Sequence, residues 1–477
     1  MANCVLSFNK DVSLIEEATD QVVVQSPFGR NNSSYHNLTV EQVSPGFLAV
    51  MSILAAKGAT EEDLSNLVLQ TDGVSQLPNF YYYLQKFTNL GLICHTVLDD
   101  GLPLAIRIPL SPADNLELLE AAIDQKFMLS RFAYCHQDRG QLILESPLSQ
   151  AKIILTNWKG AALIAELAKP QSASEISSQL SGISAESIQL FFSLLLSANM
   201  LDKTPEGDKS QEVESDTLAQ WEFHDLLFHA RSRRGRHNNS VGKTFRFLGQ
   251  IEQPPIVKPK MSDDIIELYR PDIERLKAED CPFTRVLEER KSVRHYHDEP
   301  ITDRQLGEFL YRSARVKRIF TTNSGELTNR PYPNGGSRYE LELYVVVNTC
   351  DRIPSGLYHY DPQDHQLCRL KAQSHHIAPL LEEAYLATGK ASRPQILIIL
   401  AARFPRVAWV YESIAYSLIL KGVGCLQQTM YLVATAMNLA PCAIGCGNAD
   451  LFATAVGTDY YAESSVGEFI LGSQPSP

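Results

Sequence analysis

The sequence predicts an α+β protein that consists of two small, similarly built modules followed by a larger C-terminal domain. Its 477 residues exceed what a single hydrophobic core usually serves. The N-terminal half contains two sequence echoes in the same order, and a polar segment follows them. The C-terminal part then combines β-branched and apolar runs with one long helical pattern. These observations favour separate cores over one continuous domain.

The first module is predicted for residues 1–105. Its apolar spacing, caps and turn residues indicate strands, three helices and a hairpin that turns at Asp99-Asp100-Gly101. The predicted elements are alternating apolar runs at Val5–Ile15 and Gln21–Gln25, helices at Pro45–Ala56, after Thr60 and at Pro78–Asn89, and a hairpin at Leu90–Pro109. This order is typical of a winged-helix-like module.

The second module is predicted for residues 106–205 because the first one recurs there. Gln141–Pro147 echoes Gln21–Pro27, and Leu167–Leu180 echoes Leu54–Leu67. Two echoes in the same order at nearly the same offset make an internal repeat the simplest interpretation.

The segment after the modules changes character. Lys203–Thr217 is polar and charged and contains proline and glycine, so a linker is predicted there. Residues 206–260 are accordingly assigned to a linker and a helix that leads into the last domain, residues 261–477. Within that domain the run Pro394–Ala401 is continuously apolar, which predicts a strand buried on both faces. The other predicted elements are helices at Arg285–Arg290, Asp303–Arg315 and Tyr411–Asn438, and strands at Tyr339–Asn348, Gly356–Asp361, Gln366–Leu370 and Glu468–Leu471.

Charge and composition argue against several functions. The chain has 55 acidic and 43 basic side chains, a net charge of −12, and its first hundred residues hold four basic against eleven acidic groups. Such a balance disfavours nucleic-acid binding, so we expect the modules to bind peptide, for example along an exposed strand edge. No signal-peptide pattern or long apolar run occurs, and the nine cysteines suit free thiols in the cytoplasm. Cys442 and Cys446, with Cys425 nearby, lack metal-site spacing, so no metal is expected.

One short stretch concentrates charge. Arg290, Lys291, Ser292 and Arg294 put three cations and a hydroxyl into five positions. In an extended segment Arg290, Ser292 and Arg294 would share one side. A buried cluster of this kind needs an anion, and the phosphate of flavin mononucleotide (FMN) would be a suitable partner. Alone, the same string is equally typical of a surface salt-bridge cluster.

Several other motifs in the C-terminal domain accompany the cationic stretch. Arg290–Tyr296, Arg330–Ser337 and Gly356–Tyr360, taken together, resemble the nitroreductase-like azoline dehydrogenases. Tyr411–Tyr416, the Gly424-x3-Gln428-Thr429 pattern and the Gly445–Gly447 loop continue the resemblance, which covers about residues 215–472. With two modules in front, the chain is most similar to the thiazoline oxidases of cyanobactin pathways. The resemblance implies a central, mostly antiparallel sheet with flanking helices, and a homodimer that binds FMN.

The resemblance also implies the cofactor site. Arg290, Lys291, Ser292 and Arg294 would hold phosphate, ribityl or ring oxygen atoms of FMN. Residues of the glycine-containing turn would approach the flavin, and residues of the later helix and loop would complete the ring pocket. These further residues are Pro333, Asn334, Gly335, Ser337, Gln428, Gly445 and Gly447.

The implied reaction oxidises a thiazoline or oxazoline ring in a ribosomally made precursor peptide. A base removes the Cα proton, hydride passes to the flavin, and O2 reoxidises it. The family often has a Lys-Tyr pair as the base, whereas Val410-Tyr411 stands here. Tyrosine has an ordinary pKa of about 10, so Tyr411 would need a nearby cation, for which Lys421 is the candidate. Tyr416 and His359 are alternatives for the base.

Two other functions remain open from the sequence. The C-terminal domain alone would suit a general NAD(P)H-dependent nitroreductase. The absence of lysine at position 410 also allows a non-catalytic scaffold that docks a precursor peptide.

Overall fold

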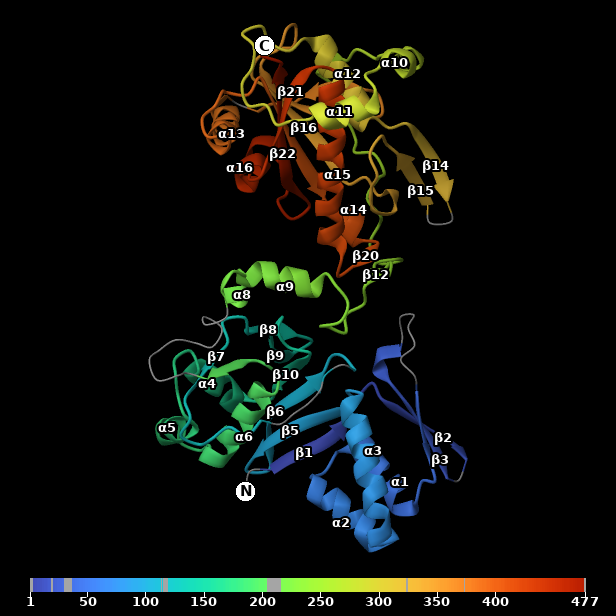
Figure 1. Cartoon of the computed structure of the whole chain (residues 1–477), viewed down its shortest axis with the longest axis vertical. Coiled ribbons are helices and arrows are strands. Elements are labelled where there is room, and N and C mark those ends of the chain that lie inside the picture. The colour runs from blue at the N-terminus through green and yellow to red at the C-terminus, as the bar shows by residue number, and fades with distance from the viewer. Residues whose placement is uncertain are drawn as a thin grey trace. The chain divides into compact units, whose positions relative to one another are not determined.

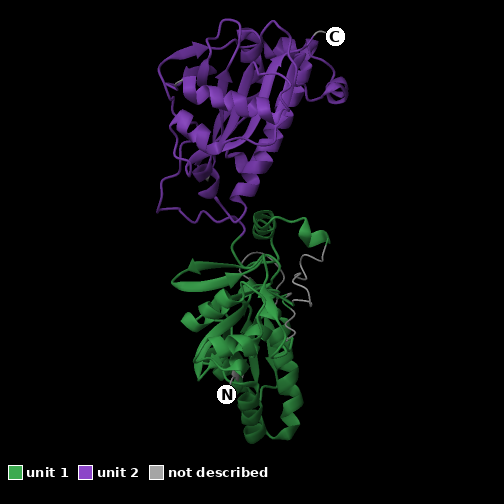
Figure 2. Cartoon of the chain, turned by 90° about the vertical axis from the view of Figure 1, so that its left-hand side faces the viewer, with its two compact units in different colours: residues 1–240 green, residues 241–477 purple. Residues whose placement is uncertain are grey.

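The computed structural model describes residues 3–18, 20–29, 37–112, 114, 119–203, 216–322, 325–372 and 374–475. It divides into two compact units, residues 1–240 and 241–477 (Figure 2). The division falls within residues 206–260, where the sequence predicts a linker. Residues 206–215 of that linker lie outside the described part.

Unit 1 begins with the elements expected of the first module. Ser44 caps the first helix by accepting from the Phe47 amide, and Thr60 caps the second by accepting from the Asp63 amide. The elements are β1 (Asn3–Phe8), β2 (Ser13–Ala18), β3 (Gln21–Gln25), β4 (Leu38–Glu41), α1 (Pro45–Ala56), α2 (Glu61–Asp72), α3 (Leu77–Asn89), β5 (Ile93–Asp99) and β6 (Leu102–Pro109). The single run expected at residues 5–15 is two strands, because the chain turns between β1 and β2.

The hairpin turn lies where the sequence predicts it. Asp100 and Gly101, which join β5 to β6, both have positive φ angles of 49° and 75°. Two consecutive residues of this kind give a turn whose twist matches that of the flanking strands.

The second half of unit 1 repeats the order of strands followed by three helices. Its elements are β7 (Phe127–Leu129), β8 (Tyr134–Asp138), β9 (Gln141–Glu145), β10 (Ala151–Leu155), α4 (Trp158–Glu166), α5 (Ala173–Gln179), α6 (Ala185–Leu196) and β11 (Leu201–Lys203). The echoed segments are equivalent in structure, since β9 corresponds to β3 and α4–α5 to α1–α2. In place of a closing hairpin, β11 pairs with β7.

One sheet joins the two halves of unit 1. Its six strands run antiparallel in the order β1-β5-β6-β10-β9-β8, and β6 pairs with β10 from Pro109↔Ala151 to Ala105↔Leu155. The predicted module boundary at residue 105 therefore falls inside β6. Two short helices, α8 (Asp216–Ala219) and α9 (Phe223–Arg231), complete the unit (Figure 1). Arg231 at the end of α9 forms a 2.8 Å ion pair with Glu145 of β9.

Unit 2 is built on a seven-stranded sheet, and every neighbouring pair of its strands is antiparallel. This confirms the predicted central sheet. In spatial order the strands are β13 (Ile265–Glu267), β18 (Gln366–Arg369), β17 (Gly356–Asp361), β16 (Leu341–Val347), β19 (Ile396–Arg403), β22 (Glu463–Ser473) and β21 (Leu439–Ile444).

Helices cover both faces of this sheet because its central strands are apolar on both sides. Ile398, Leu400 and Phe469 belong to a core with α12 (Asp303–Ala314) and α15 (Ala415–Ala436). Leu397 and Ile470 belong to a second core with α13 (Ser374–Ala387) and α16 (Ala449–Val456). Figure 1 shows α15 running along its face of the sheet. The remaining elements are α10 (Ile273–Glu279), α11 (Phe283–Glu289), α14 (Phe404–Ala408), β12 (Gly242–Lys243) with β20 (Tyr411–Glu412), and the hairpin β14 (Arg318–Thr322) with β15 (Gly325–Asn329).

One predicted helix begins later than expected. The sequence predicts a helix from Tyr411, but Tyr411 and Glu412 form strand β20, which pairs with β12. Ser413 then has a positive φ of 61°, and α15 starts at Ala415. Tyr411 and Lys421 therefore do not lie on one helix, contrary to the helix predicted at Tyr411–Asn438.

Candidate functional site

The cationic segment leaves α11 and runs beside β21. The Val293 amide donates to the Pro441 carbonyl at 2.8 Å. Ser292 Oγ and the Tyr431 hydroxyl are hydrogen-bonded at 2.7 Å, and the Arg290 guanidinium carbon lies 5.3 Å from the centre of the Tyr431 ring. Arg290 and Ser292 thus both contact Tyr431 of α15, as expected if alternate residues lie on the same side of an extended segment.

Lys291 and Arg294 are exposed. Lys291 lines an open depression of about 390 Å³ that also includes Thr435 and Asn438 at the end of α15. Among the described residues, neither Lys291 nor Arg294 nor Arg290 has a carboxylate within salt-bridge distance. Arg290 lies over the Tyr431 ring, and Lys291 and Arg294 are exposed, so the segment presents cations that are able to receive an anion.

The glycine-containing turn is fixed by its own asparagine. Asn334 Oδ1 accepts from the Tyr339 amide at 2.9 Å, and its Nδ2 donates to both oxygens of Glu340. The turn also packs on α15: a β-carbon at Gly335 would lie 3.4 Å from Leu418, and one at Gly422 would lie 3.0 Å from the Asn334 amide nitrogen. Pro333 at its start is exposed, and Ser337 has a positive φ of 55°.

Tyr411 reaches the same turn. A β-carbon at Gly336 would lie only 2.2 Å from the Tyr411 hydroxyl oxygen, and Gly336 has a positive φ of 62°. The glycine therefore both permits the backbone conformation and makes room for the tyrosine. The Tyr411 side chain is 8% exposed. The turn and the candidate base, 75 residues apart in sequence, belong to one site.

Arg338 lies at the end of this turn, and no sequence pattern indicates that it is buried. Its side chain is 2% exposed, and its Nε and Nη1 atoms have no hydrogen-bond partner in the described structure. Burial raises the pKa of Tyr411, and the positive charge of Arg338 opposes that rise. Arg406 holds the Arg338 backbone in place, since its Nε and Nη2 donate to the Arg338 carbonyl oxygen at 3.3 and 3.1 Å.

Two predicted site residues lie on the exposed side of α15. Lys421 and Gln428 are both exposed. Lys421 has no hydrogen-bond or ion-pair partner among the described residues, and no contact joins it to Tyr411. The two predicted catalytic residues are therefore not brought together within one chain.

The alternative bases differ in accessibility. His359 is fully buried, and its Nε2 hydrogen-bonds to Glu342 at 3.1 Å. This histidine belongs to the core under the other face of the sheet, where its ring lies 5.2 Å from that of Tyr344. Tyr416 is 47% exposed at the start of α15 and packs near Phe404.

The Gly445–Gly447 loop connects β21 to α16, where the Asn448 side chain accepts from the Leu451 amide. Nothing lies within 4 Å of a β-carbon built at Gly445, but one at Gly447 would lie 2.0 Å from Glu468 Oε1. Both glycines are exposed, but only Gly447 lies close to the Glu468 carboxylate.

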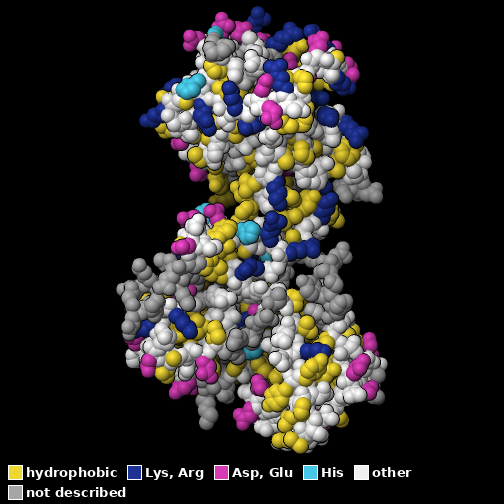
Figure 3. Space-filling model, viewed as in Figure 1, with side chains coloured by type: hydrophobic (Ala, Val, Ile, Leu, Met, Phe, Trp, Pro, Cys, Tyr) yellow, Lys and Arg dark blue, Asp and Glu magenta, His cyan; other side chains and the backbone are white. Residues whose placement is uncertain are grey.

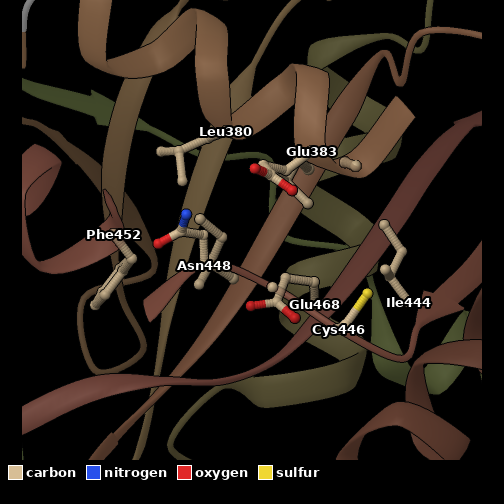
Figure 4. Close-up of a pocket in the computed structure, with 11 residues that line it drawn as sticks. Leu380, Glu383, Ile444, Cys446, Asn448, Phe452 and Glu468 are labelled. Carbon is tan, nitrogen blue, oxygen red and sulfur yellow. The ribbon is translucent and has the colours of Figure 1, made fainter. Parts of the chain in front are cut away.

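Glu468 is a second residue that the sequence did not single out. It lines a small pocket together with Glu383 of α13 and Asn448 (Figure 4). Burial raises the pKa of Glu468 to about 7, against a hydrogen bond from Ser465 that lowers it. At neutral pH this carboxyl group is therefore only partly ionised.

The residues fit a phosphate-bearing flavin. Arg290, Lys291 and Arg294 can supply the charge that a phosphate requires, and Ser292 supplies a hydroxyl. Gly445 is exposed, with nothing within 4 Å of a β-carbon built there. By contrast, no cluster of three or more His, Cys, Asp or Glu side chains suited to a metal occurs in the part of the chain that the structure describes. The same part contains no helix with the length and apolar character needed to cross a membrane.

Three family models match successive parts of the chain. The helix-turn-helix domain of the ThcOx proteins matches residues 1–118, the cyanobactin oxidase ThcOx matches residues 127–238, and the nitroreductase family matches residues 287–473. The site described above lies almost entirely within the last of these matches.

Individual proteins are similar over parts of the chain. A Methanocaldococcus jannaschii protein assigned as a nitroreductase is 31% identical over 185 residues, which are 38% of this chain and 85% of that protein. The trifolitoxin-processing protein TfxB of Rhizobium leguminosarum bv. trifolii is 27% identical over 132 residues, 27% of this chain and 35% of TfxB. This chain thus spans about a third of TfxB. The crystal structure of an assigned nitroreductase from Anabaena variabilis aligns with a TM-score of 0.38 and 21% identity, covering 51% of this chain and 45% of that one.

Proposed function

This chain belongs to the nitroreductase family, and we propose that it is an azoline oxidase that uses FMN to oxidise thiazoline or oxazoline rings of a ribosomally made peptide, in a pathway of the cyanobactin type. The products are thiazoles or oxazoles, and O2 is the final electron acceptor. The proposal depends most on the contact between the Tyr411 hydroxyl and Gly336. This contact places a candidate proton acceptor against the turn that would approach the flavin.

Several residues would hold FMN. Arg290, Lys291, Ser292 and Arg294 would bind its phosphate, ribityl or ring oxygen atoms, and a cation near the ring oxygens favours the reduced form. The turn, α15 and the loop would surround the ring through Pro333, Asn334, Gly335, Ser337, Gln428, Gly445 and Gly447. Bound FMN would supply the two-electron chemistry, as acceptor of the Cβ hydride of the azoline ring and donor of both electrons to O2.

The chain's own contribution to the chemistry is to orient the ring and remove a proton. Tyr411 would accept the Cα proton on its phenolic oxygen as the Cβ hydride departs, which leaves a double bond and an aromatic ring. Its burial between the turn and β12 limits competition from water.

Unit 1 would bind the precursor peptide. On the face seen in Figure 3, Lys and Arg side chains of unit 1 gather near the end of α9, and elsewhere on this unit they are few and lie among Asp and Glu. That pattern does not suit a duplex phosphate backbone. The free edges of the three-stranded sheet β2-β3-β4 could instead accept an added peptide strand. Tight binding of duplex DNA at physiological salt, without binding of precursor peptide, would rule this role out.

We further propose a homodimer and a cytoplasmic location. Leu420, 39% exposed, lies beside Lys421 on the outer side of α15, which leaves this helix available to a second subunit. Light scattering of the purified protein tests the dimer. In the cytoplasm, the nine free cysteines would stay reduced.

The direct test of the function incubates a thiazoline-bearing peptide with the protein, FMN and O2. Mass spectrometry should show a loss of about 2 Da for each oxidised ring. If the protein binds FMN but the mass of the peptide does not change, a non-catalytic docking scaffold would be favoured.

A general nitroreductase is the second candidate, favoured by the 31% identity to the M. jannaschii protein. The added unit 1 argues for a macromolecular substrate instead. If the protein turns over NAD(P)H and small nitroaromatics at a rate far above its rate with azoline peptide, the general nitroreductase would replace the azoline oxidase as the proposed function.

A further inference from the structure

The residues that follow unit 1 in the sequence are fixed to one short stretch of unit 2. We call residues 242–255 the entry segment. At its start β12 pairs with β20 (Figure 1), and the Thr244 amide donates to the Val410 carbonyl oxygen at 3.0 Å. Further on, three carbonyl oxygens of the segment accept hydrogen bonds from side chains of residues 403–409: Ile251 from Trp409 Nε1 at 2.8 Å, Pro254 from Arg406 Nη1 at 2.8 Å, and Pro255 from Arg403 Nη2. The sequence predicts a linker here, but the structure makes these residues part of unit 2.

Arg406 contacts both the entry segment and the glycine-containing turn. Its Nη1 donates to the Pro254 carbonyl oxygen, while its Nε and Nη2 donate to the Arg338 carbonyl oxygen at 3.3 and 3.1 Å. The Arg406 side chain is fully buried. A planar guanidinium carries several N–H groups in a fixed fork, so it can meet two acceptors at once. One side chain thus connects two backbone segments that are distant in the sequence.

The turn needs such a connection because its backbone is strained. Ser337 and Tyr339, on either side of Arg338, have positive φ angles of 55° and 45°. Residues other than glycine keep this conformation only where the surrounding structure holds them. Asn334 holds the turn from within, since its Oδ1 accepts from the Tyr339 amide at 2.9 Å. Arg406 holds it from outside, at the carbonyl group that lies between the two strained residues.

The charge of Arg406 has no comparable use in packing. Arg403, which also contacts the entry segment, forms an ion pair with Glu342 at 3.1 Å. The side-chain hydrogen bonds of Arg406 in the described part of the chain go to main-chain carbonyl oxygens instead. Burying a guanidinium is costly. A neutral side chain would avoid this cost, but none carries three nitrogen atoms that could donate to both carbonyl groups.

We propose that Arg406 is a positioning residue that joins the turn to the entry segment and so keeps Gly336 against the Tyr411 hydroxyl. The connection to azoline oxidation rests on the proposed function. Because the Tyr411 hydroxyl lies against Gly336, a shift of the turn would change the place of the candidate proton acceptor. The entry segment is then a part of the site and not a passive connection.

Hydrogen–deuterium exchange of the full chain, without FMN or peptide, tests the joining role. The reporters are the amides of Arg338 and Tyr339 in the turn and of Gln250 and Ile251 in the entry segment, because each donates a hydrogen bond within its own segment. Exchange is compared in the wild type, Arg406→Met and Arg406→Lys, with the central strand β16 as the reference for global unfolding. Arg393→Met is the control, since Arg393 pairs with Glu382 at the surface. Circular dichroism checks that each variant is folded.

Arg406→Met should speed exchange in both segments by about tenfold or more, and by more than in β16. Arg406→Lys should speed it less, because a lysine keeps the cation but not the fork. Arg393→Met should leave both segments unchanged. Faster exchange in only one segment or in neither, or an equal effect of Arg393→Met, would overturn the joining role. If Arg406→Met does not fold, Arg406→Lys decides by the same criterion.

The flavin environment then separates positioning from a purely structural contact. At saturating FMN, Arg406→Lys should change the visible circular dichroism of the bound flavin. It should also lower kcat for azoline oxidation by about tenfold, with KM for the peptide little changed because Arg406 is buried. Faster exchange with an unchanged flavin spectrum and kcat would overturn the positioning role.

Failure of this inference is distinguishable from failure of the proposed function. If both segments respond to Arg406 but the wild type oxidises no ring, only the proposed function fails. If the wild type oxidises rings but neither segment responds, only the positioning role fails.

Discussion

The hydroxyl of Tyr411 lies against the α-carbon of Gly336, so closely that a β-carbon there would be 2.2 Å from the oxygen. Because Gly336 also has a positive φ, no other residue fits without moving Tyr411 or the turn. The predictions below start from this contact and follow the site outward to the phosphate segment and the loop.

Replacing Gly336 by alanine should reduce both stability and activity. The left-handed backbone and the clash with Tyr411 together should lower the free energy of unfolding by roughly 1–3 kcal/mol, measured by denaturant unfolding. Gly424→Ala is the matched control, since nothing lies within 4 Å of its β-carbon on α15. It should stabilise the helix by roughly 0.5–1 kcal/mol. If the two substitutions change the free energy of unfolding equally, the contact between Gly336 and Tyr411 does not contribute to stability.

Replacing Tyr411 by phenylalanine should remove the proton acceptor and leave the packing nearly intact. We expect azoline oxidation to fall by roughly 100-fold or more, with FMN affinity unchanged. Tyr416→Phe tests the exposed alternative base and should change the rate little. If Tyr411→Phe oxidises azolines at the wild-type rate, a group other than Tyr411 is the proton acceptor.

Replacing Arg290 by methionine should weaken FMN binding by about tenfold or more, which corresponds to ~1.4 kcal/mol for one charge-assisted contact to a phosphate. Titration by flavin fluorescence measures this. Riboflavin, which lacks the phosphate, should lose far less affinity. Arg285→Met is a suitable control because Arg285 lies on α11, the helix that ends just before Arg290, and pairs with Glu289. An equal loss for FMN and riboflavin would contradict a phosphate role.

Replacing Glu468 by glutamine should stabilise the protein at alkaline pH. The pKa of Glu468 is raised from an ordinary 4.5 to about 7, so the folded chain retains a proton that the unfolded chain loses. The resulting stability is complete below about pH 4.5 and is lost as pH rises through about 7. The shift corresponds to about 3 kcal/mol. Glu468→Gln should therefore raise Tm at pH 8 and match the wild type near pH 4.5.

Glu382→Gln is the control for Glu468, because Glu382 is exposed on α13 and paired with Arg393. It should leave the pH dependence of Tm unchanged. Parallel Tm curves for Glu468→Gln and wild type across this range would contradict a raised pKa at Glu468.

Local signals predicted much of this fold. The cap Thr60 fixes the start of α2, and Asp100-Gly101 fixes the hairpin turn. The apolar run Pro394–Ala401 gave strand β19, buried on both faces. Such features are determined by residues that are close together in the sequence, so they can be predicted from the sequence alone.

Other features depend on contacts between distant segments. Strand β20 forms only because Lys243 pairs with Tyr411, which displaced the start of α15 from the position its apolar pattern favoured. Arg338 and Glu468 look like ordinary surface charges in sequence. Arg338 lies where Arg406 donates to its carbonyl oxygen, and Glu468 lies against Gly447 and the α13 face. The roles of the predicted cofactor residues remain predictions that the variants above test.

Mass spectrometry of a thiazoline peptide treated with the protein, FMN and O2 tests the central claim most directly, with the Tyr411→Phe protein run in parallel. We predict a loss of about 2 Da for each ring with the wild type and little or no loss with the variant over the same time. An unchanged peptide mass with an FMN-loaded wild-type protein would contradict the account.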